Sequence, residues 1–422
     1  MDAGTSPERS SPRTITTRCC IVGGGPAGMM LGYLLGRAGV DTIVLEKHAD
    51  FFRDFRGDTV HPSTLQVMDE LGLIDEFLKL PHQRLQTMDG KFGEASIRIA
   101  DLSRLKVKYP FIAFMPQWDF LNFLRENGKR FASLSVMMSA DATDLIRSGD
   151  TVIGVKANTP EGPVEIRADL TIGCDGRHSM VRQRAGLEVE EIGAPMDVLW
   201  FRAGKGADEN EGLFARVEPG KMMVTFDRGD YWQCAYVIAK GQYEAVRARG
   251  LDAFRDAIVG LAPILRSGIS DVKSWDDVKL LTVAINRLKR WTRPGLLCIG
   301  DAAHAMSPVG GVGVNLAVQD AVATANLLAA RLAGGCPSED ELDAVRRRRA
   351  FPVRMTQAMQ VVVQNRLISA ALKPGNQPLK PPLPVRLINA TPWLQGITAR
   401  LIGLGVRPEH VRSPVSPVSP GS

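Results

Sequence analysis

The chain shows two kinds of hydrophobic pattern. Apolar runs that lead into glycine-rich turns and then into helices occur near residues 17–35, 169–182 and 295–332. In contrast, residues 198–238 form successive strands without helices, and residues 84–101 alternate apolar and polar positions. Strands joined through helices predict a parallel sheet, whereas strands in direct succession predict an antiparallel one. The chain should therefore be an α/β protein with two architectures.

The first run has the spacing of a phosphate-binding turn. A strand over residues 17–22 is followed by Gly23-x-Gly25-x-x-Gly28 and a small-residue helix over residues 27–35. The glycines allow a tight turn, close approach of the backbone to phosphates and close packing of helix on strand. A second strand then ends in Glu46, about 20 residues beyond the glycines, where a carboxylate binds a ribose hydroxyl. This order of elements predicts a dinucleotide site.

The other two runs also end in ligand-binding patterns. One strand ends in Asp175-Gly176 before a helix. Another strand ends in Gly300-Asp301, and further glycines precede a long helix over residues 315–332. Ligands bind at the carboxyl ends of parallel strands, and glycines let backbone amides approach them. All three runs are therefore expected to meet at one site.

The remaining elements are simpler. An amphipathic helix over residues 65–73 should start near Pro62 and stop at Gly72, with His61 capping or packing before it. Other expected helices cover residues 115–124, 252–265 and the region up to about 364, and short strands cover 135–138, 152–155, 164–167 and 280–285. The basic, apolar segment 385–406 is expected to dock on its own protein rather than on a membrane.

Composition narrows the class of protein. The 422 residues are long enough for two to three domains, and the net charge of +6 is diffuse except at Arg346 to Arg349. No aromatic residues interleave with that run, so it predicts a solvated helix face and no nucleic-acid partner. The six cysteines form no CxxC pair, and the polar N-terminus does not resemble a secretory signal. We expect a cytoplasmic protein without a metal site.

Together the three motifs resemble the class A, single-component flavoprotein monooxygenases, the para-hydroxybenzoate hydroxylase-like family. The resemblance covers residues 17–365 and keeps the family's order. The matching stretches are Gly23 to Gly28 with Glu46, Asp175-Gly176-Arg177-His178-Ser179 with Arg182, and Gly300-Asp301-Ala302-Ala303-His304 with Pro308, Gly310, Gly313 and Asn315. It implies a Rossmann-like FAD-binding domain of the GR2 type, an inserted antiparallel β-sheet substrate domain and a helical C-terminal region.

The resemblance also implies where cofactors bind. Glu46 would bind the adenosine ribose and Asp301 the ribitol, while Asp175 and His178 would serve both FAD and NAD(P)H. The implied cofactor-binding residues are Gly23, Gly25, Pro26, Ala27, Gly28, Glu46, Lys47, Arg56, Gln117, Asp175, His178, Gly300, Asp301, Pro308, Gly311, Gly313, Val314 and Asn315. The loop with Pro308, Gly310, Gly311 and Gly313 would lie beside the isoalloxazine. No catalytic base can be matched, and His304 is expected to be structural.

The implied reaction is a hydroxylation. NAD(P)H would reduce FAD, O2 would add at C4a, and the flavin hydroperoxide would hydroxylate an aromatic or polyketide-like molecule. Apolar strands carrying Trp200, Phe201, Met223, Phe226 and Tyr236 could shield it from water, although each residue taken singly is expected to be sheet core and not a substrate contact. An FAD-dependent reductase or dehydrogenase resembling the prenyl-lipid saturases, or a non-catalytic flavin-binding module, are the alternatives. The absence of a second Gly-x-Gly-x-x-Gly after a strand argues against two-dinucleotide-domain reductases and Baeyer–Villiger enzymes.

These patterns predict the following organisation, with the oligomeric state left open. The FAD-binding domain would comprise residues 15–83, 110–186 and 284–345, the substrate domain 84–109 and 187–283, the C-terminal helical region 346–412, and disordered tails 1–14 and 413–422.

Overall fold

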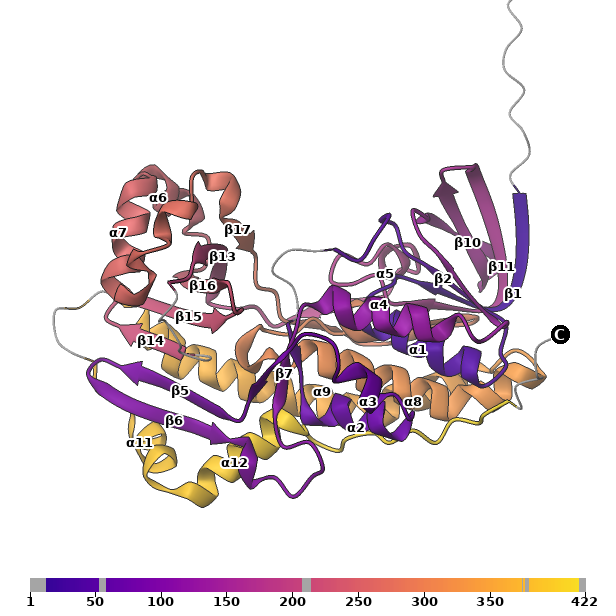
Figure 1. Cartoon of the computed structure of the whole chain (residues 1–422). Helices are drawn as coiled ribbons and strands as arrows, with labels where there is room; N and C mark the ends of the chain where they lie inside the picture. Colours follow the sequence, from indigo (N-terminus) through magenta and orange to yellow (C-terminus); the bar gives the residue numbers. More distant parts are fainter. Residues whose placement is uncertain (1–12, 53–57, 207–213, 374, 376–378, 417–422) are drawn as a thin grey trace, which may run out of the picture.

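The computed structural model describes residues 13–52, 58–206, 214–373, 375 and 379–416. The predicted α/β class is confirmed, because a mostly parallel sheet and a mostly antiparallel sheet lie at opposite ends of the molecule (Figure 1). Long C-terminal helices run beneath both sheets.

The first sheet has eight strands. They are β1 (Arg13–Val22), β2 (Thr42–Leu45), β8 (Leu134–Met137), β9 (Asp141–Ser148), β10 (Thr151–Thr159), β11 (Gly162–Gly173), β19 (Thr292–Arg293) and β20 (Leu296–Cys298). The order β20-β11-β1-β2-β8 is parallel throughout, with Val22 beside both Leu45 and Gly173, and Gly173 beside Cys298. The carboxyl ends of four strands therefore meet at one edge, as the three motifs predicted.

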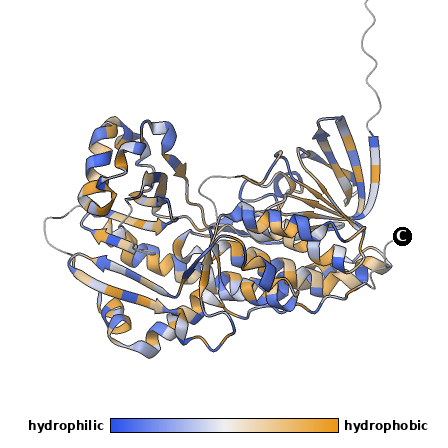
Figure 2. Ribbon diagram, in the orientation of Figure 1, coloured by the Kyte–Doolittle hydropathy of each residue, from blue (hydrophilic) through white to orange (hydrophobic). Residues whose placement is uncertain are grey.

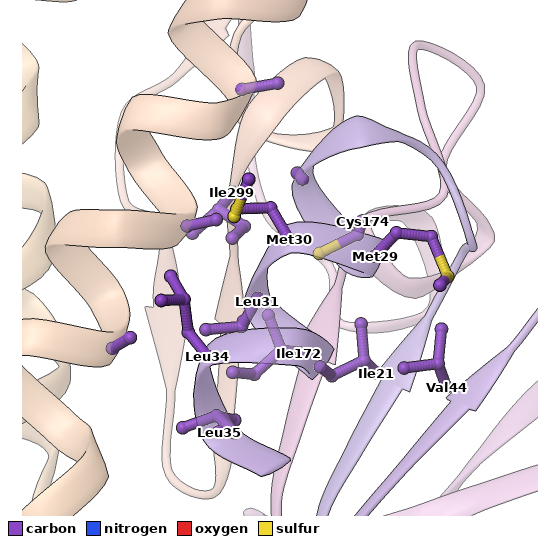
Figure 3. Packing of buried hydrophobic residues seen from close by; sticks show 14 of the residues in the cluster. Ile21, Met29, Met30, Leu31, Leu34, Leu35, Val44, Ile172, Cys174 and Ile299 are labelled. Atoms are coloured by element: carbon purple, nitrogen blue, oxygen red, sulfur yellow. The ribbon is translucent and has the colours of Figure 1, made fainter. Parts of the chain in front are cut away.

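Helices cover this sheet through apolar contacts. Helix α1 (Pro26–Arg37) is buried from Ala27 to Gly36 and packs against β1, β2 and α8 (Gly313–Gly334). Figure 3 shows Ile21, Leu31 and Ile172 converging in this core. Within the described residues, Val309–Gly334 is the stretch apolar and long enough to cross a membrane, but it is largely buried as a core helix. Hydropathy alternates along β10 and β11, which lie at the solvent-exposed end of the sheet (Figure 2).

The second sheet has seven strands in the order β17-β13-β16-β15-β14-β5-β6. Their bounds are β5 (Thr87–Phe92), β6 (Ala95–Asp101), β13 (Met196–Gly204), β14 (Phe214–Glu218), β15 (Lys221–Asp227), β16 (Tyr231–Ala239) and β17 (Lys279–Leu281). Pairing is antiparallel except between β14 and β5, which are parallel. Helices α6 (Tyr243–Ala248) and α7 (Leu251–Leu261) cover its outer side (Figure 1).

Smaller elements connect the two sheets. They are β3 (Thr59–Val60), β4 (Gln83–Leu85), β7 (Ile112–Phe114), β12 (Val189–Glu191), β18 (Asn286–Leu288), α2 (Pro62–Glu70), α3 (Ile74–Phe77), α4 (Gln117–Gly128) and α5 (Met180–Arg184). The C-terminal part contains α9 (Glu339–Val363), a π-helical turn (Gln364–Ile368), α10 (Ser369–Ala371), α11 (Leu383–Ala390) and α12 (Pro392–Gly403). As expected, segment 385–406 docks on its own protein, because α11 and α12 lie against β6.

The structure differs from the expected elements in three places. Strand β9 was not predicted, and β11 is one strand where two were expected. The expected strand 280–285 is reduced to the short β17. At the ends, β1 already begins at Arg13, and Ser416 N donates to Arg37 O at 2.9 Å. Parts of both predicted disordered tails are therefore held against the protein.

A buried ionic network joins the helices to the first sheet. Asp320 in α8 accepts from Gly300 N at 3.0 Å and lies 2.5 Å from His304 Nε2 and 2.8 Å from Arg349 Nε. Burial opposes ionisation of Asp320, but His304 and Arg349 hold its pKa below the ordinary value. Glu409, near the C-terminus, accepts from Arg349 Nη1 at 3.4 Å. The network thus fixes the Gly300 turn from three distant segments, and His304 has the structural role expected of it.

Breaking this network should cost much more stability than breaking an exposed pair. We expect Asp320→Asn to lower the free energy of unfolding by about 3–5 kcal/mol, because the buried Arg349 then keeps only its longer 3.4 Å contact with the Glu409 carboxylate. Arg348→Gln, which removes the half-exposed partner of Glu409, should cost less than about 1 kcal/mol. Urea unfolding of the flavin-free proteins gives both values. Equal losses of unfolding free energy in the two variants would contradict the role of Asp320 at the centre of the buried ionic network.

Candidate functional site

The glycines of the first motif serve two different purposes. A Cβ at Gly28 would lie 1.9 Å from Gly23 O, and a Cβ at Gly23 (φ +105°) would lie 2.5 Å from Cys174 O. These two glycines therefore let α1 and β11 pack tightly on the turn. Gly25 precedes α1, and a Cβ there would meet nothing within 4 Å. Its open side leaves room for an anion at the helix N-terminus, beside the unpaired first amides.

Glu46 forms the rim of this turn. Its Oε2 accepts from Gly24 N at 3.1 Å, and its Oε1 accepts from His48 N at 3.1 Å. The carboxylate therefore lies beside the glycines, where the sequence placed a ribose ligand. Lys47, the next residue, is exposed.

The second motif lies next to the first, and its side chains have different surroundings. Asp175 accepts from Ser179 Oγ at 2.5 Å and from Val181 N at 3.1 Å, so it caps α5, and burial raises its pKa. Its contacts are within its own turn, whereas His178 is exposed. Arg182, which is buried, donates to Ala302 O at 3.3 Å and ties the second motif to the third.

The third motif touches the first directly. A Cβ at Gly300 (φ +58°) would lie 3.1 Å from Ala27 Cβ and 3.5 Å from Ala317 Cβ, so α1, α8 and the turn after β20 converge there. Asp301 is about one-third exposed, and its Oδ2 lies 3.8 Å from Arg177 Nη2. Asp301 is thus held at the edge of the sheet with a carboxylate still accessible to a polyol.

The loop from Pro308 to Asn315 is fixed by hydrogen bonds from β3 and α2. Gly310 and Gly311 have positive φ values of 80° and 63°. Thr59 Oγ1 donates to Gly311 O at 2.9 Å, and Asn315 Oδ1 accepts from His61 N at 2.9 Å and from Thr64 Oγ1 at 2.6 Å. Asn315 therefore holds the loop in place, a role that the sequence did not reveal.

Two glutamines of α9 bind the backbone that leads into this loop. Gln357 Nε2 donates to Asn286 O at 2.8 Å and to Ala305 O at 3.1 Å. One turn later, Gln360 Nε2 donates to Ser307 O and to Val309 O, both at 2.9 Å. Their spacing places both amides on one face of the helix. Neither glutamine stood out in the sequence, because a lone polar residue in a helix carries no local signal of its partner.

His61 is fully buried below the loop. Its Nδ1 lies 2.8 Å from Ile402 O, and since a carbonyl can only accept, Nδ1 carries the proton. Its Nε2 has no hydrogen-bond partner within the described part of the chain. Burial lowers the pKa of His61 from 6.5 to about 4, so the ring is neutral at physiological pH. The structure thus gives His61 a packing role, as expected, and links the loop to α12.

Two predicted FAD contacts, those of Gln117 and Arg56, are not established by the described residues. Gln117 begins α4, and the neighbouring Trp118 packs on Phe52 with ring centroids 4.7 Å apart. Arg56 falls in the segment after Phe52 and lies outside the described residues. Their assignment to FAD therefore stays a prediction.

The aromatic residues expected to shield the site lie on two opposite faces of the second sheet. Trp200 and Phe226 are on the face whose Met222 and Val237 pack against Val309 of the loop. On the other face, Phe201, Met223 and Tyr236 pack with α7. These three are therefore sheet core and do not face the loop, because side chains alternate between the two faces of a strand.

The geometry fits FAD. A pyrophosphate needs a glycine-lined helix N-terminus, which Gly25 offers with its open side, and the two polyol ends need carboxylates, which Glu46 and Asp301 offer at the same edge. An isoalloxazine needs backbone amides near its pyrimidine ring, and the glycine loop ending at Asn315 supplies a backbone free of side chains.

Comparison with known proteins agrees with this fit. Residues 16–359 match the family described as "FAD binding domain". The chain belongs to this family. It is 30% identical over 406 residues to 6-methylpretetramide 4-monooxygenase of Streptomyces rimosus, with 94% of each chain covered. The predicted membership of the class A flavoprotein monooxygenases is therefore confirmed.

Solved structures show the same relationship. Anhydrotetracycline hydroxylase from Streptomyces rimosus superposes with a TM-score of 0.70 at 25% identity, covering 93% of this chain and 77% of that one. p-Nitrophenol 4-monooxygenase from Pseudomonas putida shares the fold, with a TM-score of 0.72 at 20% identity and coverage of 92% and 96%.

The two roles of the glycines can be separated by mutation. Gly28→Ala should destabilise the flavin-free protein by at least about 3 kcal/mol, since the new methyl would overlap Gly23 O. Gly25→Ala should keep the stability but weaken FAD binding roughly ten- to a hundredfold, because its methyl enters the open side of the turn. Urea unfolding and FAD fluorescence titration measure the two effects. A Gly25→Ala protein with unchanged FAD affinity would show that the phosphates bind elsewhere.

The buried His61 should make the protein sensitive to acid. The unfolded state binds a proton near pH 6.5 and the folded state only near pH 4, so stability falls as the pH drops through this window. The contribution of His61 is about 3 kcal/mol between neutral pH and pH 4. Unfolding of wild type and His61→Asn across this range tests it. The variant should show a flatter pH dependence, and parallel curves would contradict the assignment.

Proposed function

We propose that the protein hydroxylates an aromatic, polyketide-like small molecule with NAD(P)H and O2. The observation that carries the proposal is the aromatic face of the second sheet opposite the glycine loop of the FAD site. Support comes from the relative of similar length, which is named for the oxidation of 6-methylpretetramide. When bound, FAD would supply the electron transfer from NAD(P)H and the activation of O2.

The described aromatic residues suit a flat, fused-ring substrate. Trp200 and Phe226 are stacked at 5.8 Å between centroids, and Phe226 and Phe114 at 5.0 Å. Planar apolar rings of this kind bind planar ligands and exclude water from the reacting atoms. Arg228 lies over Phe114, with its Cζ 4.7 Å from the ring centroid, and places a cation at the end of the stack.

A closed polar network positions this aromatic stack relative to the flavin loop. Arg228 Nη2 lies 2.5 Å from Asp58 Oδ2, Gln233 Nε2 donates to Asp58 at 2.6 Å, and Arg228 Nε donates to Gln233 Oε1 at 2.9 Å. Asp58 directly precedes Thr59, which binds Gly311. The network thus fixes the second sheet on the same short strand that holds the flavin loop.

NAD(P)H recognition is proposed for the exposed side of the second motif. His178 is exposed there, and the Arg177 guanidinium adjoins Asp301, so an imidazole and a permanent cation are available to the phosphates of the nicotinamide cofactor. Arg56 would contribute a further cation. His178 would act for both cofactors, with Asp175 holding the turn that presents it.

We propose a cytoplasmic location, supported by the free thiols. Cys19, Cys20, Cys174, Cys234 and Cys298 are buried and unpaired, and Cys336 is exposed and unpaired. An exposed free thiol persists in a reducing compartment.

The substrate proposal is tested with NAD(P)H oxidation and oxygen uptake. 6-Methylpretetramide or anhydrotetracycline should stimulate both at least about tenfold, and p-nitrophenol should not, because one ring fills little of the stack. A reductase would consume NAD(P)H without substrate-dependent oxygen uptake.

A matched pair of variants tests the aromatic face. Phe226→Leu should raise the KM for the stimulating compound roughly tenfold with little loss of stability. Phe201→Leu, on the face that packs on α7, should lower stability and leave KM unchanged. The reverse pattern would place the substrate elsewhere.

A further inference from the structure

The residues that helix α12 buries differ from those that an ordinary surface helix buries. Its buried residues are small or polar, namely Gln395, Ala399 and Gly403. A Cβ at Gly403 would lie 3.2 Å from Pro62 and 3.3 Å from Leu102, so the helix packs closely through this face. A surface helix normally buries its large apolar side chains. Here Ile402 packs partly buried on the cluster around Leu102, and other large apolar side chains stay outside.

Four large apolar side chains of α11 and α12 point to solvent. They are Leu383 (64% exposed), Leu387 (51%), Trp393 (64%) and Ile397 (45%). Each helix contributes a pair four residues apart, which places the members of a pair on one helix face. Both helices lie at the outer edge of the molecule beyond β5 and β6 (Figure 1). We name these four residues the outer apolar face.

The surroundings of this face are basic. Residues 344–408 contain nine arginines and two lysines and no carboxylate. Lys380, Arg386 and Arg400 are exposed beside the outer apolar face and form no ion pair with a described residue.

Carboxylates on the neighbouring strands do not cancel these charges. Asp89 is bound by Arg98 at 2.6 Å, and Asp101 is bound by Arg104 at 3.0 Å. Glu94, in the turn between β5 and β6, is a single carboxylate against the several cations of this segment.

The charges select the kind of partner. A second copy docking by the same face about a two-fold axis would bring like charges together without carboxylates in the segment to pair with them. An anionic lipid surface suits both the exposed apolar side chains and the positive charges. Trp, Leu and Ile enter the acyl boundary, while Lys and Arg bind headgroups. We propose that the outer apolar face docks on anionic membranes, with α11 and α12 lying in the plane of the interface.

The test is sedimentation of the FAD-loaded protein with vesicles. Vesicles of equal parts phosphatidylglycerol and phosphatidylcholine should bind the protein, and vesicles of phosphatidylcholine alone should bind it at least about tenfold more weakly. Leu387→Ser combined with Trp393→Ser should reduce binding roughly tenfold or more. Arg386→Gln and Arg400→Gln should each reduce it about fivefold and weaken its dependence on salt. Leu280→Ser, which alters an exposed leucine of β17, is the matched control and should bind like wild type.

The outcomes are distinct from those for the proposed reaction. FAD content and NAD(P)H oxidation in solution should be the same for wild type and the Leu387/Trp393 variant. Absence of binding to anionic vesicles, or equal binding by this variant, overturns the proposal. So does a dimer detected by light scattering that the variant abolishes, because a second copy would then cover the face.

Discussion

The close packing of α1 on β1 is the constraint on which the rest of the structure depends. Only hydrogen fits at Gly28, since a methyl would lie 1.9 Å from Gly23 O. The same approach brings Ala27 against Gly300, so the first and third motifs share one contact. Parallel strands then bring Glu46, Asp175 and Asp301 to a single edge. A site for a long cofactor follows from the packing of one helix.

The second sheet is attached to this site through short-range polar contacts. The short strand β3 connects them, because Thr59 binds the glycine loop and Asp58 binds Arg228 and Gln233 of the second sheet. From behind, Gln357 and Gln360 hold the backbone that leads into the loop. The position of the second sheet relative to the glycine loop thus depends on buried hydrogen bonds, in which an unpaired group is costly.

Much of the fold, and the meeting of the three motifs at one edge, could be predicted from local sequence. Glycine spacing, apolar strands and terminal carboxylates are local signals, and they located the turn, Glu46 and Asp301. The partners of His61 and Asp320 could not be found in this way. His61 binds Ile402, which is 341 residues away, and Asp320 binds Arg349 and His304 across α8 and α9. Such pairings depend on tertiary packing, which no local pattern encodes.

The direction in which each face of a strand points is also hard to predict from the sequence of that strand alone. Trp200 and Phe201 are adjacent in sequence, but one faces the flavin loop and the other faces α7. The sequence showed that the strand was apolar on both faces, and only the position of the helices distinguishes them. β9 escaped detection because its polar ends obscure a two-residue apolar centre at Leu145 and Ile146.

The most direct test of the account is the fate of isotopically labelled molecular oxygen. The FAD-loaded protein is supplied with NAD(P)H, labelled O2 and the fused-ring compound that stimulates oxygen uptake most, and the product is analysed by mass spectrometry. The account predicts one labelled oxygen atom in the organic product, with the other in water. NAD(P)H consumption that yields only labelled hydrogen peroxide, or a product oxidised without labelled oxygen, would contradict it.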